Sequence, residues 1–319
     1  MLGAEADVYS SPRKWQLSLS YRNQHSDRRF LGSQEVPDPH VAVNDIHLFE
    51  LSLSYALSSR YSLAVDVPIV DMNREQSIRS GQTFGGRFDT QAGGLGDISI
   101  MARRRLFDPA KNQRRNISLG LGTKIPTGKD DVVDEFQTFN GPVVQTVDQS
   151  IQPGDGGWGI ELEASDLETV GKSFMLVATA NYLSNPRGTN GVPTYRPRAS
   201  EATMSVPDQY LGRLGMEFPV WSKSKLWGTL AARIEGVPVH DLLGPSTGFR
   251  RPGYAVSIEP GLVVSTKSNT FGVSVPYAIY RNRTESVPDQ MDEPIPMTLG
   301  NGDAAFADYL VLVGYSRTF

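Results

Sequence analysis

The chain has 319 residues, of which 39% are hydrophobic, and its mean hydropathy is -0.30. Its longest purely apolar runs, such as residues 174–178, are far below the roughly 18 residues of a membrane helix, which excludes a helical membrane protein. The net charge of -4 and the absence of a basic stripe argue against nucleic acid as a partner. Because there is no cysteine, disulfides and thiolate metal sites are excluded.

The first residues leave the export signal undecided. Ala4-Glu5-Ala6 has the small-x-small form of a cleavage site, but only three residues precede it. Either the numbering starts inside a leader, or Met1 was added to a mature chain.

A period of two begins at residues 14–22, where Trp15, Leu17, Leu19 and Tyr21 share one face and polar residues the other. The same alternation continues in residues 45–57 and 61–69, which only three residues separate. Two alternating runs this close predict a β-hairpin.

Further alternating stretches follow, and the connections between them are short and long in turn. Short turns are predicted at residues 108–112, 165–172, 219–224 and 265–269, with longer polar loops between the hairpins. The remaining predicted strands are residues 96–107, 116–125, 158–164, 173–183, 208–218, 225–235, 254–264, 270–281 and 309–319.

This organisation predicts an all-β protein, a transmembrane antiparallel up-and-down β-barrel of about 12 strands in the bacterial outer membrane. Short turns then face the periplasm, and long loops face the outside. We expect a single domain over residues 1–319, with residues 1–13 as a periplasmic N-terminal segment. A soluble β-sandwich or propeller also has alternating strands, but usually shorter ones without this asymmetry of connections.

Three positions do not fit a regular barrel wall. Pro260 and Pro276 fall inside predicted strands, although a closed barrel has no edge where a missing N–H is harmless. A bulge is plausible at Pro260 because Gly261 follows it, and Pro276 predicts a local break. Arg104 falls on the lipid-facing phase, close to a turn, where a long side chain reaches the headgroups.

Charged residues occupy the phase that would face the lumen. They would be unfavourable in an apolar core unless paired, whereas a water-filled barrel accommodates them. In a channel they would set ion selectivity; the alternative is a network that only stiffens the wall. The predicted lumen-facing residues are His47, Asp66, Asp97, Arg103, Arg105, Lys124, Glu161, Glu163, Arg213, Glu217, Arg233, Glu235 and Glu259.

Three glycine-rich segments carry a family resemblance: residues 93–97 (GGLGD), 120–128 (GLGTKIPTG) and 154–159 (GDGGWG). Their order resembles the outer-membrane β-barrel family named for the meta-pathway of phenol degradation. The resemblance covers about 70 residues. It implies a channel-like barrel loosely linked to the uptake of aromatic compounds. The terminal Phe319 also resembles the recognition signal of outer-membrane assembly, although Arg317 departs from its usual apolar third-last position.

The functional hypothesis is therefore a channel for passive diffusion of small solutes, aromatic or weakly polar compounds among them. We expect no enzyme, no cofactor and no metal; the partners are outer-membrane lipid, lipopolysaccharide and a small-molecule solute. One alternative is a barrel whose long loops bind a partner or lipopolysaccharide. A less favoured one is an outer-membrane hydrolase, because the four histidines, His25, His40, His47 and His240, lie in no nucleophile motif.

Overall fold

The computed structural model describes residues 14–81, 83–171, 173–196, 198–220, 225–291 and 306–319. The expected periplasmic segment, residues 1–13, and residues 221–224 of one expected turn lie outside this part of the chain. Helix within the described ranges is limited to η1 (Gln149–Ile151), η2 (Ala199–Glu201) and α1 (Val287–Met291). None of these is long and apolar enough to cross a membrane.

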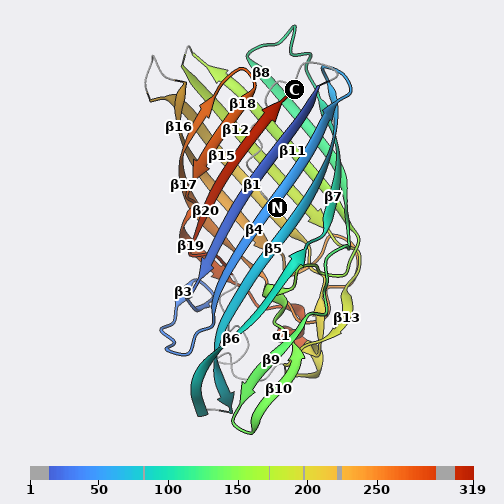
Figure 1. The fold of residues 1–319 in the computed structure, drawn as a ribbon, viewed down its shortest axis with the longest axis vertical. Helices are drawn as coiled ribbons and strands as arrows, with labels where there is room; N and C mark the ends of the chain where they lie inside the picture. Colours follow the sequence, from blue (N-terminus) through green and yellow to red (C-terminus); the bar gives the residue numbers. More distant parts are fainter. Residues whose placement is uncertain (1–13, 82, 172, 197, 221–224, 292–305) are drawn as a thin grey trace.

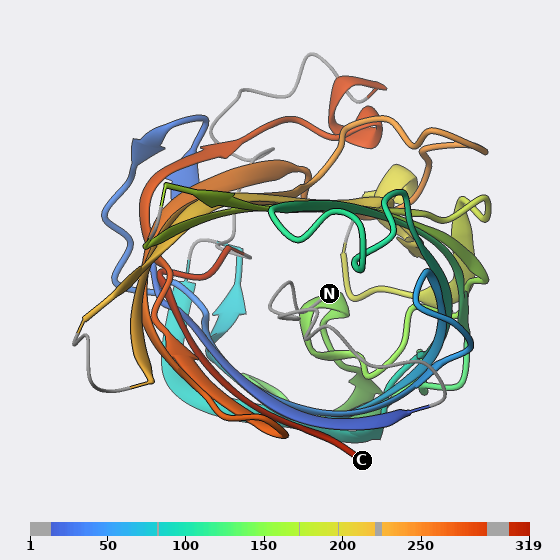
Figure 2. The same cartoon turned by 90° about the horizontal axis from the view of Figure 1, so that it is seen from above.

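Twelve antiparallel strands form a closed barrel, which confirms the predicted fold class (Figures 1 and 2). Closure comes from β20 pairing with β1, from Gln16 opposite Thr318 to His25 opposite Tyr309. β18 and β19 together occupy one strand position. The barrel strands are β1 (Trp15–Ser26), β4 (Val43–Ala56), β5 (Tyr61–Ser80), β7 (Ile98–Arg105), β8 (Arg115–Ile125), β11 (Gly159–Val170), β12 (Phe174–Ser184), β15 (Gln209–Pro219), β16 (Leu226–Val237), β17 (Gly253–Ser265), β18 (Asn269–Ser274), β19 (Tyr277–Arg283) and β20 (Tyr309–Thr318).

Further strand pairs extend from the barrel at the long-loop rim, in segments that the sequence pattern predicts to be loops. β5 runs on past the predicted end at residue 69 and pairs there with β6 (Thr83–Leu95), which has no other strand partner among the described residues. The other pairs are β2 (Phe30–Leu31) with β3 (Gln34–Glu35), β9 (Val133–Thr138) with β10 (Gly141–Thr146), and β13 (Thr189–Pro193) with β14 (Thr203–Ser205).

The outward row of β5 locates the edge of the lipid-facing belt. Tyr61, Val65 and Ile69 expose 47%, 39% and 52% of their surface, as expected of side chains that face lipid rather than water. Two residues beyond Ile69 the same row becomes polar at Asp71. The apolar belt on this strand therefore ends between these two residues, and the β5–β6 extension stands in water.

The two prolines occupy one interruption of the wall. Val275 and Pro276 separate β18 from β19, so the predicted break is present. Pro260 lies across from that break, between the stretch of β17 that pairs with β18 and the stretch that pairs with β19. Its missing N–H therefore leaves no ladder bond unmade, while its carbonyl accepts from the Val275 N–H at 3.0 Å. Pairing with β16 is unshifted across Pro260, and the register shift of this wall lies at Val256/Ser257 instead of at Gly261.

We expect Val65→Arg to destabilise the barrel by about 2–4 kcal/mol, because it places a charge in the middle of the lipid-facing belt. Asp71→Arg, on the same row of the same strand but past the belt, is the control and should cost less than about 1 kcal/mol. Urea unfolding of the protein in lipid vesicles measures both. Equal losses of unfolding free energy in the two variants would contradict the position assigned to the edge of the lipid-facing belt.

Candidate functional site: the lumen and its inward loop

The inward phase of the strands carries the charges. Along each strand they alternate with exposed apolar side chains such as Leu63, Leu119 and Leu230. Asp97 lies in the connection between β6 and β7 and also faces the interior. The predicted residues found on the inward phase are Asp66, Arg103, Arg105, Lys124, Glu161, Glu163, Arg213, Glu217, Arg233, Glu235 and Glu259.

His47 is the exception, and its expected place in the lumen has to be corrected. It lies two residues from the outward-facing Phe49 on an unbroken strand, so both side chains are on the outer face. There its Nδ1 is 2.8 Å from the Tyr21 hydroxyl. The predicted phase is therefore wrong at the start of this strand.

On the β15–β17 wall the charges are packed against one another. Arg233 and Glu259 are 1% and 0% exposed. The Glu259 Oε1 accepts from Arg213 Nε at 3.0 Å and from Ser274 Oγ at 3.1 Å, and Arg233 also bonds to Glu235 at 2.6 Å. Ions this deeply buried need such partners to offset their desolvation. This side of the barrel is thus filled, which fits the wall-stiffening interpretation.

A second ion pair of the wall spans three strands. Arg103 on β7 donates to both carboxylate oxygens of Glu163 on β11, at 2.7 and 3.0 Å. Gly120 of β8 lies between them in register. A Cβ there would come within 2.9 Å of Met101 Sδ and 3.0 Å of Glu163 Cβ, so the glycine leaves the room that this ion pair uses.

A cavity of about 540 Å³ remains inside the barrel. Apolar side chains of β4 and β5, including Leu48, Val70 and Met72, form one part of its lining. Charged and amide side chains form about half of the remainder, and further apolar residues such as Met101 and Leu183 belong to it as well. This volume is within the range of small-molecule sites.

The connection between β8 and β11 folds into the barrel and covers this cavity. Figure 2 shows its light-green segment inside the ring of strands. Val147 and Ile151 are completely buried and pack against the inward Val70 and Met72 of β5. Ser150 Oγ also donates to Asn44 Oδ1 of β4 at 3.3 Å. We call residues 126–158 the inward loop.

Asp148 ties the inward loop to opposite sides of the barrel. It accepts two hydrogen bonds of 2.7 Å from Arg251, which lies in the connection between β16 and β17. Arg74 of β5 approaches it at 3.8 Å, and the Tyr195 hydroxyl donates to it at 2.5 Å. Its Oδ1 also caps η1 through the Ser150 N–H. Nothing in the sequence pattern singled out Asp148, because its partners come from three distant segments.

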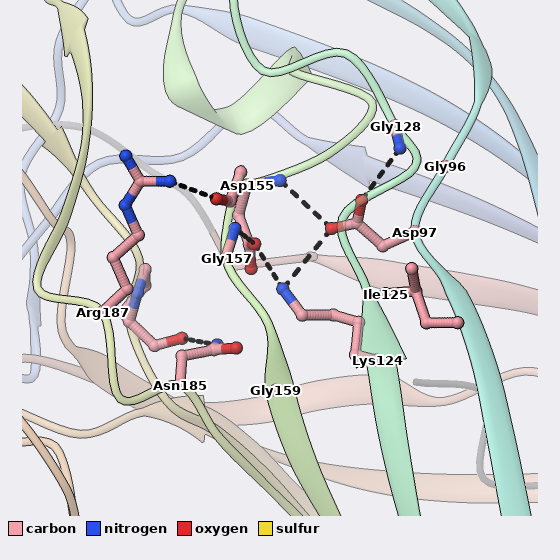
Figure 3. A network of polar contacts seen from close by, with 12 residues as sticks. Gly96, Asp97, Lys124, Ile125, Gly128, Asp155, Gly157, Gly159, Asn185 and Arg187 are labelled. Carbon is pink, nitrogen blue, oxygen red and sulfur yellow. Dashed lines mark hydrogen bonds and ion pairs between the residues drawn. The ribbon is translucent and has the colours of Figure 1, made fainter.

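Both ends of the inward loop are held at one junction (Figure 3). The Asp97 carboxylate accepts from the Gly128 N–H at 3.0 Å, near the start of the loop, and from the Asp155 N–H at 3.2 Å, near its end. Lys124 bridges the carboxylates of Asp97, at 3.4 Å, and Asp155. Lys124 therefore belongs to this junction, and both of its carboxylate partners lie outside the barrel strands.

Glycines of the three resembling segments meet at the same junction. A Cβ on Gly154 would lie 2.6 Å from the Gly128 carbonyl oxygen, and one on Gly128 would lie 2.8 Å from the Gly154 nitrogen. Gly156 has φ +76°, and a Cβ on it would overlap the Asp130 carboxylate. The glycine-rich pattern thus has a structural cause, which is the close approach of two chain segments where the loop leaves and re-enters the wall.

Loop charges serve mainly to hold the loops together. Arg187 donates to the carbonyls of Gly156, Thr189 and Asn190 at 2.7–2.8 Å. Arg198 pairs with Asp289 at 3.0 Å, linking η2 to α1. Over the described ranges, no group of three His, Cys, Asp or Glu side chains is placed to hold a metal ion.

Asp148→Asn should release the inward loop, because it leaves the buried Arg251 and Arg74 without their carboxylate. Breaking a buried pair in this way costs about 3–5 kcal/mol. Hydrogen exchange measures it as lost protection of the amides of residues 147–151, with barrel strands unchanged. Asp131→Asn, an exposed acid of the same loop, is the control. Unchanged protection in Asp148→Asn would contradict the role given to Asp148.

The loop should stay docked across ordinary pH. Burial would by itself raise the pKa of Asp148, but Arg251 and Arg74 override this and hold the pKa well below its usual range. Burial and Asp148 raise the pKa of Tyr195 to about 12, so it remains a donor. Because the carboxyl has a lower pKa in the docked loop than in the unfolded chain, where it is near 3.9, it stabilises the docked loop above that pH. This stabilisation is lost as the pH falls further. We expect the hydrogen-exchange protection of the amides of residues 147–151 to stay flat from pH 7 to about 4 and to fall below that pH; a transition near pH 6 would contradict this assignment.

Comparison with known proteins bears on the fold alone. No protein-family model and no curated protein matches the chain. The COG4313 outer membrane channel from Pseudomonas putida F1 matches with 12% identity, 99% of this chain and 100% of that chain covered, and a TM-score of 0.61. The β domain of the Bordetella autotransporter BrkA matches with 13% identity and a TM-score of 0.49, with 96% of this chain and 100% of that chain covered. The toluene transporter TodX of P. putida matches with 10% identity and a TM-score of 0.45, with 97% of this chain and 91% of that chain covered. The phenol-degradation family name therefore stays a resemblance. With its apolar outer belt and closed sheet, this chain is an outer-membrane β-barrel.

Proposed function

We propose that the protein is a passive outer-membrane channel for small solutes, aromatic or weakly polar compounds among them. The observation that carries this proposal is the cavity of about 540 Å³ inside a closed barrel, lined by both polar and apolar side chains. A barrel that only anchors loops needs no such space, since its interior can be filled as the β15–β17 wall is. One structural match above a TM-score of 0.5, an outer membrane channel, agrees with this proposal.

The inward loop then controls access from the long-loop side. It covers the cavity, is held at both ends by Asp97 and is tied across the barrel by Asp148. Solute passage therefore requires displacement of the loop or passage along its margin. No histidine lines the cavity among the described residues, which supports a conduit over a hydrolase.

A surface-interaction role draws on one feature, the β9–β10 hairpin at the long-loop rim. Phe139 and Val144 on it are 51% and 67% exposed, although they lie outside the lipid-facing belt. Exposed apolar residues away from lipid are a common mark of a contact surface. This role is compatible with conduction and becomes the principal function if the barrel does not conduct.

A reversible cross-link tests the channel and its loop together, since the native chain contains no cysteine. Asn44→Cys with Ser150→Cys replaces two residues whose side-chain oxygens are 3.3 Å apart. In planar bilayers we expect discrete openings for the unmodified protein, loss of them in the oxidised double variant, and recovery with reductant. Ser150→Cys alone is the control. Openings that persist after oxidation would place the path away from the loop, and silence even of Asp148→Asn would contradict a channel.

A further inference from the structure

The charges of the cavity are unequally shared between paired and unpaired groups. Seven acidic and four basic residues of the described chain line it, and one of the acids, Glu235, pairs with Arg233 of the neighbouring wall. Three of the bases are committed: Arg103 to Glu163, Lys124 to Asp97 and Asp155, and Arg251 to Asp148. The fourth, Arg22, donates to Gln24 at 2.6 Å and has Glu235 and Glu50 as its electrostatic neighbours. No cavity base of the described chain is thus bonded to Asp66 or Glu161, although Lys124 lies near enough to act on Glu161 electrostatically.

Asp66 and Glu161 face the cavity at neighbouring positions of the wall. Ser99 is the register partner of Asp66 and donates its hydroxyl to Glu161 Oε1 at 2.5 Å. Asp66 Oδ1 is shielded from solvent and has no hydrogen-bond partner among the described residues. A buried carboxylate oxygen without a donor is unfavourable, so a ligand that supplies one would be stabilised there.

An apolar surface borders these two acids. Ile46 and Leu48 of β4 pair in register with Met72 and Val70 of β5, and all four line the cavity. We call these four residues the apolar shelf. The next inward residue of β5 is Pro68 and the one after it is Asp66, so the shelf and the carboxylate are separated by roughly 13 Å along the strand, with apolar Pro68 midway.

We infer that the cavity contains a subsite for small organic cations with an apolar body, of the arylalkylammonium class. Asp66 and Glu161 receive the ammonium group, and Pro68 with Leu48, a shelf residue that the inward loop leaves half-buried, receives the ring. An ammonium ion carries three donors and no acceptor, which suits two carboxylates with a single hydroxyl donor between them. The two carboxylates, to which no base of the described chain is bonded, also attract cations and repel anions of the same shape. The inference rests on the proposed function, because the ligand must enter the lumen.

Three ligands of matched shape test this: phenethylammonium, 2-phenylethanol and phenylacetate, which differ in charge at pH 7. Calorimetry on the full-length protein in detergent, with empty micelles subtracted, measures their affinities. We expect the cation to bind at least about tenfold more tightly than the alcohol, and the anion most weakly. Equal affinity for the cation and the alcohol would overturn the inference.

Paired variants separate the charge from the shape of the site. Asp66→Asn with Glu161→Gln should weaken binding of the cation about tenfold and leave binding of the alcohol unchanged. Leu48→Gln should weaken binding of both ligands. The control is Asp166→Asn with Glu168→Gln, which removes two carboxylates of the same strand that lie near the turn and pair with Arg115. Retained resistance to unfolding by dodecyl sulfate at room temperature identifies folded barrels, and an unchanged cation affinity in the folded double variant would overturn the subsite.

Bilayer recordings keep the two proposals apart. If calorimetry shows the cation preference but no variant conducts, the proposed subsite is supported and the proposed channel is contradicted. If the protein conducts without any cation preference, the channel stands and the subsite falls.

Discussion

Closure of the sheet by β1 and β20 is the constraint on which the rest of this structure depends. In lipid, each backbone N–H and C=O must find its partner within the protein, and a closed ladder provides one for every strand. Once the sheet is closed, each residue faces either lipid or the interior. The alternation of Leu, Val and Tyr with Ser, Arg and Glu along the strands is the direct consequence. Even the interruption at Pro276 obeys this constraint, because Pro260 occupies the place where no donor is required.

Interior charges divide the barrel into a packed side and an open side. Arg233, Glu259 and their neighbours fill the β15–β17 wall with ion pairs that water hardly reaches. Across the lumen, β4 and β5 carry apolar residues and Asp66, β11 carries Glu161, and these residues border the cavity. One chemical type, the inward carboxylate, thus supports two roles that depend on its neighbours. Where arginine is adjacent it stiffens the wall, and where it is not we propose that it selects solute.

The inward loop couples these two sides. Asp148 bonds to Arg251 from one side and approaches Arg74 from the other, so a single carboxylate holds the loop across the barrel. The junction at Asp97 fixes where the loop leaves and rejoins the wall, which limits the positions that Asp148 can reach. Glycines at this junction are required by the closeness of the two segments. The glycine-rich pattern is therefore explained by loop attachment, independently of any solute.

The sequence by itself determined the barrel, the number of its strands and the side of each strand on which nearly every charge lies, because all of these follow from a local period of two. The sequence pattern was misleading at the start of β4, where it placed His47 in the lumen although this residue shares the outward phase of Phe49. It also placed the end of β5 at Ile69, although the strand continues beyond its apolar stretch. Only the tertiary structure decided which charges pair, that residues 147–155 fold inward, and that Asp148 meets Arg251. The Arg103–Glu163 pair joins residues 60 positions apart and the Asp148–Arg251 pair residues 103 positions apart, and no local pattern records a distance through space.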